Sequence, residues 1–405
     1  MSKILFLGIP AHGHVNPTLG LVNELIKHGE EIVYYCEEEF KEKIEKAGGE
    51  FRSYNPGIKI FGNNNGTDAM GIEEMSKRIL SMLNNCEPMI ADILEKIKDE
   101  HFDCIIYAAM FPYGAILNKI LKLPSVSSFA VFATPQEIIP KEYKFVLEKG
   151  FLEDSPIMKK YNELSCRLEG KYNIKIGKIQ DMIYNKADLN IAYTSKYFVA
   201  HKEYYDDSFV FIGPPIYDRN ENLDFPFERL QGKNVVYISM GTVFNKDLNL
   251  YNIFFNAFKN EDFTVVMSAY NVDISNFNIP ENFIVRNYVP QAEVLKYTKV
   301  AITHAGMNST SDLIYNNIPF VAIPIGADQP YMASRSEQLG ACIKLERKSL
   351  TAENLKEAVK EVYANQSYLE NIKKIKESFD EAGGYKKAVE EIFKMKKIGK
   401  SEKIS

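Results

Sequence analysis

Short apolar runs alternate along this chain with segments in which apolar residues recur at helical spacing. Residues 4–9 form a continuous apolar run, which predicts a strand covered on both faces. We expect a turn over residues 10–16 and then a helix with Pro17 in its first turn, because proline suits a helix start and apolar residues follow at helical spacing. Residues 31–36 predict a second strand. A strand–helix–strand unit implies a parallel sheet with a right-handed crossover.

The same alternation continues in two series of expected strands. The first series adds residues 104–107, 125–127 and 188–193, and the second contains residues 235–240, 263–267, 283–285, 300–303 and 320–323. Between them, the residues up to Lys233 are rich in proline and charge and lack apolar periodicity, which is typical of a linker. The pattern therefore predicts an α/β protein of two doubly wound domains, residues 1–214 and 215–384. We expect a loop over the Gly/Asn-rich residues 56–75 and a helical insertion beside a pocket over residues 135–185.

Composition narrows the class of protein. With 405 residues, 45% of them hydrophobic and 25% charged, the chain has enough apolar material for two globular domains and is neither disordered nor fibrous. The net charge of -5 argues against a nucleic-acid partner or an anionic membrane surface. The five cysteines include no CxxC pair, and no apolar run approaches the roughly 18 residues of a membrane span. We therefore expect a cytoplasmic protein without disulfides and without stable membrane insertion.

Polar and glycine residues collect directly after four of the expected strands. They occupy residues 10–17, 241–242, 304–312 and 325–330. Ligands of an open parallel sheet bind outside the carboxyl ends of its strands. The pattern therefore predicts one cleft to which both domains contribute.

The segment that begins at His304, with the sequence HAGMNSTSD, predicts an anion site. We expect Asn308 to open a helix, and the N–H groups and partial positive charge of a helix N-terminus attract phosphate. Gly306 leaves room for close backbone approach, and His304 offers a further donor. Taken alone, the segment is equally explained by Asn308 or Ser309 capping the helix.

Three other places carry side chains that suit a sugar nucleotide. Asp312 follows on the same expected helix and could reach a ribose hydroxyl. Asp328 and Gln329 suit sugar hydroxyls, although they also fit an ordinary helix start. Tyr288 and Gln291, within NYVPQ, could stack on a base and read it, or belong to a common loop.

His12 and His14 lie in the expected loop after the first strand. Either could serve as a general base, because the pKa of histidine lies near neutrality. The alternatives are imidazoles that bond their own loop, or a metal site. No third histidine, cysteine or close carboxylate stands at ligand spacing, so a metal is not expected.

Several motifs are absent from the sequence. There is no GxGxxG after the first strand, no GxxxxGK[ST] and no GxSxG. The sequence therefore lacks the main motifs that would identify a dinucleotide oxidoreductase, a P-loop NTPase or an α/β-hydrolase. Asp-x-Asp, with which many nucleotide-sugar enzymes hold a divalent cation, is also absent. We expect neither a metal nor another cofactor.

Six motifs in order resemble the nucleotide-sugar-dependent glycosyltransferases of glycosyltransferase family 1, above all the bacterial macrolide and flavonoid enzymes. They are PAHGHVNPTL, FIGPP, SMGT, YVPQAEVL, THAGMNSTSD and PIGADQP, and they span nearly the whole chain. The resemblance implies the GT-B fold, in which two Rossmann-like domains face each other across a cleft. It further implies an acceptor-binding first domain, a donor-binding second domain, and a last helix, at about residues 385–400, that packs back on the first domain.

The resemblance also implies a role for each matching residue. His14 would be the catalytic base. The donor-binding residues would be Tyr288, Val289 and Gln291 for uracil, His304, Gly306, Asn308, Ser309 and Thr242 for the diphosphate, Asp312 for the ribose in place of the usual glutamate, and Asp328 and Gln329 for the sugar. The candidates for contact with an acceptor are His12, Phe111, Tyr113 and Phe132.

The activity implied is metal-independent, inverting transfer of a hexose, with glucose expected, from a UDP-sugar to a hydroxyl of a small lipophilic acceptor such as a macrolide, a flavonoid or another phenolic. The expected protein is a monomer or a weak dimer. One residue departs from the family, since Ala108 stands where an aspartate usually pairs with the catalytic histidine. The chain would then be an impaired enzyme, natively or through a deliberate replacement. The alternatives are a non-catalytic nucleotide-sugar-binding protein and a related nucleotide-sugar enzyme.

Overall fold

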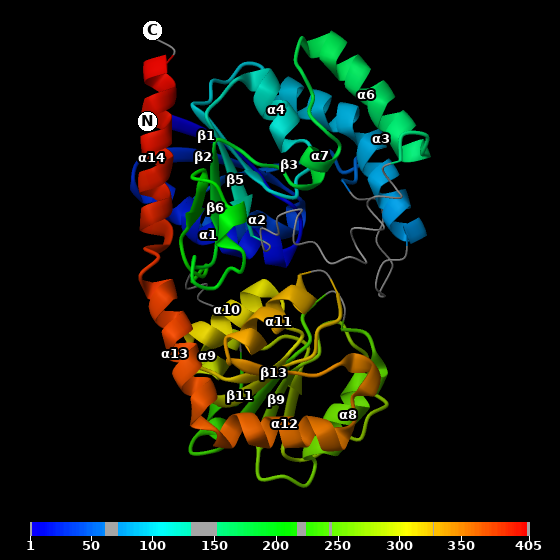
Figure 1. Ribbon diagram of the computed structural model, residues 1–405, viewed down its shortest axis with the longest axis vertical. Helices are drawn as coiled ribbons and strands as arrows, with labels where there is room; N and C mark the ends of the chain where they lie inside the picture. Colours follow the sequence, from blue (N-terminus) through cyan, green and yellow to red (C-terminus); the bar gives the residue numbers. More distant parts are fainter. Residues whose placement is uncertain are drawn as a thin grey trace.

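The computed structural model describes residues 2–60, 72–130, 152–216, 224–242, 245–326 and 328–402. Within these ranges the chain forms two α/β lobes that lie one above the other along the long axis (Figure 1). Each lobe contains one sheet of parallel strands with helices on both faces. The prediction of two doubly wound sheets is confirmed.

The first sheet has seven strands in the order β3-β2-β1-β4-β5-β6-β7. They are β1 (Ser2–Leu7), β2 (Glu30–Cys36), β3 (Glu50–Ser53), β4 (Cys104–Ala108), β5 (Ser125–Phe129), β6 (Leu189–Ala192) and β7 (Phe209–Phe211). The helices of this lobe are α1 (His12–Lys27), α2 (Lys41–Lys46), α3 (Ile72–Ile97), α4 (Gly114–Leu121), α6 (Pro156–Tyr172) and α7 (Gln180–Ile183). Ile4 and Phe6 pack with α1, whereas Leu5 and Leu7 pack with α3 and α6. Because β1 is covered on both faces, its apolar run is continuous.

The second sheet has six strands in the order β10-β9-β8-β11-β12-β13. They are β8 (Val235–Ser239), β9 (Thr264–Ser268), β10 (Phe283–Arg286), β11 (Thr298–Thr303), β12 (Phe320–Ala322) and β13 (Cys342–Lys344). The helices are α8 (Leu248–Phe258), α9 (Gln291–Leu295), α10 (Met307–Tyr315), α11 (Gln329–Gln338), α12 (Ala352–Ala364) and α13 (Gln366–Asp380). This strand order is that of a dinucleotide-binding α/β domain, whose ligand crevice lies where the order reverses, here between β8 and β11.

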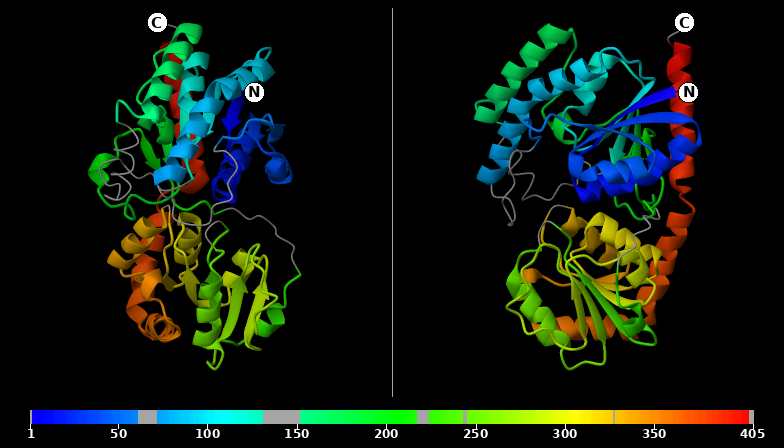
Figure 2. Two further views of the ribbon diagram at one scale, coloured as in Figure 1. Left: turned by 90° about the vertical axis from the view of Figure 1, so that its right-hand side faces the viewer. Right: turned by 180° about the vertical axis from the view of Figure 1, so that it is seen from behind.

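The last helix, α14 (Gly384–Glu402), returns to the first lobe and packs on α1 and β6. Seen from behind, α13 and α14 run up one side of both lobes (Figure 2). The side chain of Lys396 forms an ion pair with Glu30 and donates to Ser2, and both charged side chains are only 9% exposed. Helix α13 contacts α10 of the second lobe, and α14 contacts α1 of the first lobe. The segment formed by α13 and α14 therefore joins the two lobes.

Some predicted boundaries are wrong. Strands β3, β7 and β13, each at the edge of its sheet, were not predicted. The turn expected over residues 10–16 is mostly helix, since α1 begins at His12 and contains Pro17 in its interior. Residues 72–75, expected in a loop, belong to α3, and the rest of that Gly/Asn-rich loop falls largely outside the described residues.

The described residues contain no helix that is both long and apolar enough to cross a membrane. The cysteines are not joined in disulfides. Cys36, Cys86, Cys104 and Cys342 are buried, and Cys166 is exposed. No group of three or more histidine, cysteine, aspartate or glutamate side chains in the described ranges could hold a metal ion.

Candidate functional site

The first turn of α1 lies against the second lobe. Ala11 precedes the helix in an extended conformation, so that Gly13 and His14 occupy its first turn. Pro17 has no backbone N–H and leaves the Gly13 carbonyl without the usual donor four residues further on. The side-chain Nδ2 of Asn308, at the start of α10, donates to this carbonyl at 3.0 Å. The beginnings of α1 and α10 therefore meet at one hydrogen bond between the lobes.

His14 is half-buried beside this contact. Burial lowers the pKa of its imidazole to about 4, so the ring is neutral at ordinary pH. Neither ring nitrogen has a partner among the residues that the structure describes. A neutral imidazole can accept a proton, but a low pKa makes it a weak base.

Ala108 ends β4, directly next to β1. Its neighbour Tyr107 lies beside Leu7 of β1, and β1 leads through four residues to the helix that carries His14. The Ala108 side chain is 1% exposed and belongs to the apolar cluster under α3. A methyl group stands at this position and supplies no charge that could orient an imidazole.

His12 is held by the first lobe and touches the second. Lys43 Nζ lies 3.3 Å from its Nδ1, and Glu39 Oε1 lies 3.3 Å from its Nε2. Since an ammonium group can only donate, Nδ1 accepts and Nε2 carries the hydrogen. The ring packs edge-on against Phe40 and against Tyr270, which follows β9 in the second lobe. These contacts make His12 part of the surface on which the lobes meet.

The N-terminus of α10 exposes unpaired polar groups. Its N-cap is Gly306, which has no side chain, so the expectation that Asn308 or Ser309 caps the helix is wrong. The amide of Met307 donates to Asp328 Oδ2 at 3.1 Å. Among the described residues, the amides of Asn308 and Ser309 have no acceptor. Such amides at a helix start suit an anion.

Two buried side-chain atoms point to a ligand at the same place. His304 Nδ1 and Asn308 Oδ1 are buried, and neither has a hydrogen-bond partner in the described part of the chain. Leaving a buried polar atom unpaired costs about 1–3 kcal/mol, which a ligand could recover. The imidazole can donate to a phosphate oxygen, and the amide oxygen can accept from a hydroxyl.

The His304 ring fits between two glycines. A Cβ atom on Gly241 would lie 2.7 Å from its Nε2, and one on Gly306 would lie 2.6 Å from the same atom. The space expected beside Gly306 for an approaching ligand is thus filled by the imidazole itself. Burial lowers the pKa of His304 to about 4, against the raising effect of a hydrogen bond to the Ser239 backbone.

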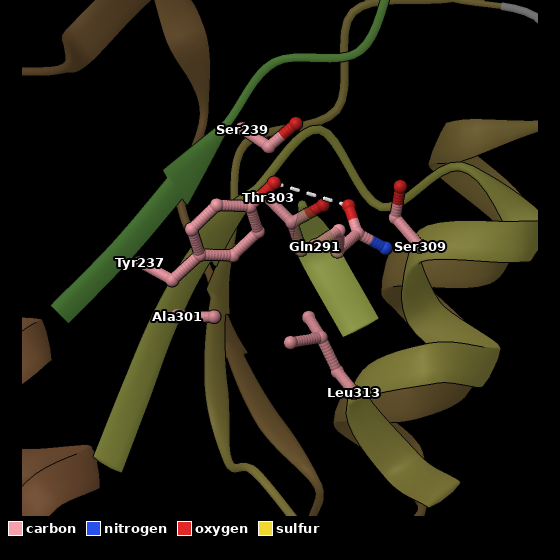
Figure 3. Close-up of a pocket in the computed structure, with 7 residues that line it drawn as sticks. All are labelled: Tyr237, Ser239, Gln291, Ala301, Thr303, Ser309 and Leu313. Carbon is pink, nitrogen blue, oxygen red and sulfur yellow. Dashed lines mark hydrogen bonds between the residues drawn. The ribbon is translucent and has the colours of Figure 1, made fainter. Parts of the chain in front are cut away.

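A chain of hydrogen bonds links the expected base and ribose residues. Tyr237 Oη donates to Gln291 Oε1 at 3.1 Å, and Gln291 Nε2 donates to Asp312 Oδ2 at 2.7 Å. Figure 3 shows the first of these bonds in a small pocket. The pocket is lined by Tyr237, Ser239, Gln291, Ala301, Thr303, Ser309 and Leu313. These two hydrogen bonds fix which way the Gln291 amide faces. They also place the Asp312 carboxylate next to it.

The remaining donor candidates differ in exposure. Tyr288 is 42% exposed in the loop between β10 and α9, whereas Val289 is 3% exposed. Thr242 is exposed after β8. Gln329 is buried, and its Oε1 accepts from the amides of Ile325 and Gly326, so that it shapes its own loop.

Burial raises the pKa of Asp328, and the bond from the Met307 amide opposes that effect. Its carboxylate thus ties the loop before α11 to the start of α10. The candidate sugar residues therefore also support the candidate phosphate site.

Apart from His12, the acceptor candidates lie in the core or outside the described residues. Phe111 and Tyr113 are 0% exposed, and Tyr113 Oη donates to the Met82 carbonyl. Phe111 stacks on Tyr54. An acceptor would contact these rings only by displacing their neighbours, so their placement favours a packing role. Phe132 is not among the described residues.

The sequence analysis did not single out two residues that contact the candidate site residues, Tyr237 and Tyr270. Tyr237 lies within the apolar strand VVYIS, and its hydroxyl is the only signal there of a polar role. Tyr270 directly follows the segment TVVMSA, and nothing in its pattern indicates contact with the other lobe.

Comparison with known proteins shows the family of the chain and agrees with its fold. Residues 227–380 match the sequence model of the family described as UDP-glucoronosyl and UDP-glucosyl transferase. The chain is 39% identical over 396 residues to the uncharacterized UDP-glucosyltransferase YojK of Bacillus subtilis, covering 97% of both chains. It is 31% identical over 398 residues to the NDP-glycosyltransferase YjiC of the same organism, covering 96% of both.

The fold matches a solved structure over nearly its full length. The calicheamicin glycosyltransferase CalG4 superposes with a TM-score of 0.81 at 22% identity, covering 98% of each chain. The predicted GT-B architecture is thereby confirmed. Since the identity to YojK extends over almost the whole of both chains, this protein belongs to the UDP-glycosyltransferases of glycosyltransferase family 1 and is a nucleotide-sugar glycosyltransferase.

Proposed function

We propose that this enzyme transfers a hexose, glucose, from a UDP-sugar to a hydroxyl of a small lipophilic acceptor, with inversion at the anomeric carbon and without a metal ion. One observation supports this most directly. The hydrogen bond from Asn308 to the Gly13 carbonyl joins the helix start that carries His14 to the helix start that presents unpaired amides. This contact supports a base on one lobe beside an anion site on the other.

On the donor side, the start of α10 would hold the diphosphate. The amides of Asn308 and Ser309, the helix dipole and His304 would stabilise the charge that develops as the nucleoside diphosphate leaves. Asp312, oriented by Gln291, would bind the ribose, and Tyr288 would stack on the uracil. Asp328 and Gln329 would contact the sugar.

On the acceptor side, His14 would remove a proton from the attacking hydroxyl. The oxygen then attacks the anomeric carbon as the bond to the diphosphate breaks, so a single displacement inverts that centre. An acidic phenol needs less help from the base than an alkyl hydroxyl does. Because His14 is a weak base without a carboxylate at position 108, phenolic acceptors are favoured.

The test is a screen of acceptors with UDP-glucose, read by mass spectrometry. We expect glucosides of phenols and flavonoids, with lower turnover of macrolide alkyl hydroxyls. His14→Ala should abolish transfer to alkyl hydroxyls and leave UDP affinity unchanged. Transfer that retains the anomeric configuration, or full activity of His14→Ala, would contradict the proposal. UDP-glucose can be compared with TDP-glucose and UDP-galactose in the same screen to test the donor.

Ala108 favours a second candidate, a protein that binds nucleotide sugars without catalysing transfer. The two candidates differ in acceptor-dependent release of UDP. Release that rises with acceptor concentration identifies a transferase, whereas tight UDP-glucose binding without turnover of any acceptor identifies a binding protein.

A further inference from the structure

We infer that Asn308 is a positioning residue for His14. By holding the Gly13 carbonyl, its amide would fix the first turn of α1 against the donor-binding lobe, so that the base is in place when both lobes are engaged. This inference rests on the proposed role of His14. It adds a function for Asn308 that is separate from contact with the diphosphate.

The contact depends on a feature of each lobe. In α1, Pro17 removes the donor that would pair with the Gly13 carbonyl inside the helix, so this carbonyl is available to an outside donor. In α10, the N-cap is a glycine, so the Asn308 side chain is not needed for capping and can reach the other lobe.

Glycine at position 13 allows the lobes to approach closely. A Cβ atom added there would lie 3.7 Å from Asn308 Nδ2, which is ordinary van der Waals contact, but a larger side chain would extend toward the amide. Gly13 directly precedes His14 in the same turn. A shift of the Gly13 carbonyl would therefore move the imidazole as well.

The oxygen of the Asn308 amide is in a different environment from its nitrogen. Asn308 Oδ1 is buried and has no partner in the described residues, whereas Nδ2 is engaged with Gly13. A donor hydroxyl that bonds to Oδ1 would hold the amide in the orientation that its bond to Gly13 requires. Donor binding and the position of the base would thus be coupled through one side chain.

The test is a double-mutant cycle between the two lobes. Asn308→Ala removes the amide, and Pro17→Ala gives residue 17 an N–H that competes for the Gly13 carbonyl from within α1. We expect kcat to fall about tenfold in Asn308→Ala, the effect of one lost hydrogen bond in the transition state. In Pro17→Ala we expect a fall of about threefold, because a carbonyl can accept two bonds, with the Kd for UDP unchanged.

The double variant should be no slower than Asn308→Ala alone, because Pro17→Ala acts only through the contact that Asn308→Ala already removes. Asn282→Ala is the matched control, since its amide also donates to backbone carbonyls, those of Phe258 and Phe263, but away from the cleft. It should lower the melting temperature and leave kcat unchanged.

Additive losses of kcat in the double variant, or a Pro17→Ala enzyme with unchanged kcat, would overturn the inference. If Asn308→Ala does not fold, the Pro17→Ala result alone decides. His14→Ala separates this failure from failure of the proposed function. If His14→Ala is active, His14 is not the base. If His14→Ala is inactive and the kcat losses of Asn308→Ala and Pro17→Ala are additive, only the positioning role of Asn308 is refuted.

Discussion

At the scale of single residues, the strength of the proposed base depends on His14 and Ala108. Burial lowers the pKa of His14 to about 4, and no carboxylate at position 108 offsets that effect. The neutral, proton-accepting form predominates above the pKa. We therefore expect kcat/KM of the wild-type enzyme to fall only as the pH drops toward 4, rather than near 6.5 as for an ordinary histidine.

Ala108→Asp should restore a base dyad. A carboxylate beside the imidazole fixes its tautomer and stabilises the imidazolium, and loss of such an acid costs on the order of 10⁴ in rate in serine proteases. We expect higher turnover of alkyl hydroxyls, a smaller gain on phenols and unchanged UDP affinity. The acid limb of kcat/KM should move to higher pH, because a neighbouring negative charge raises the pKa of His14.

The control for this gain is the double variant His14→Ala, Ala108→Asp, which should show none. If Ala108→Asp improves no acceptor, His14 works alone or with another partner, and the dyad assignment is wrong. Because position 108 is buried, a melting curve should accompany the kinetics to show that the variant is folded.

His304 allows a direct test of the diphosphate site. Its buried Nδ1 has no partner in the described residues, and its ring is fitted between Gly241 and Gly306. His304→Ala should weaken UDP binding by about 1–3 kcal/mol, the range for a hydrogen bond to a charged group. Calorimetric titration measures this effect, with His28→Ala, at the far end of α1, as the control. Equal affinities of the two variants would show that the site is misplaced.

At the scale of elements, we propose that the start of α10 stabilises the leaving diphosphate, as a metal does in other nucleotide-sugar enzymes. Its free amides and dipole can stabilise the leaving diphosphate. We therefore expect turnover to be unchanged by EDTA. An enzyme that loses its activity in EDTA and regains it with magnesium or manganese would rule out this assignment.

At the scale of the whole molecule, α14 ties the chain end to the first lobe through a buried charge pair. Lys396→Met leaves Glu30 buried without its cation, which costs about 3–5 kcal/mol. We expect a lower midpoint of urea unfolding, followed by circular dichroism. Replacing both residues, with Glu30→Gln, should recover most of the loss, and a double variant as unstable as Lys396→Met would contradict this explanation.

The fold was largely predictable from the pattern of apolar residues. The central strands β1, β4, β8 and β11 are covered on both faces, so their sequences are continuous apolar runs that stand out from the amphipathic helices. Strands β3, β7 and β13 lie at sheet edges, and pairing with one neighbouring strand defines them. Glycine and polar residues after the central strands predict a ligand cleft at that edge, because parallel strands end at the same edge.

The sequence by itself thus determined the two sheets and the residue types available at their edges. Tertiary structure decided what those residues do. Pro17 indicated a helix start, yet α1 begins five residues earlier, where Asn308 of the other lobe bonds the carbonyl that Pro17 leaves unpaired. Phe111 and Tyr113 looked like acceptor contacts, yet both are buried in the core. The physical reason is that burial and hydrogen-bond partners come from segments far apart in the chain, which a local pattern does not contain.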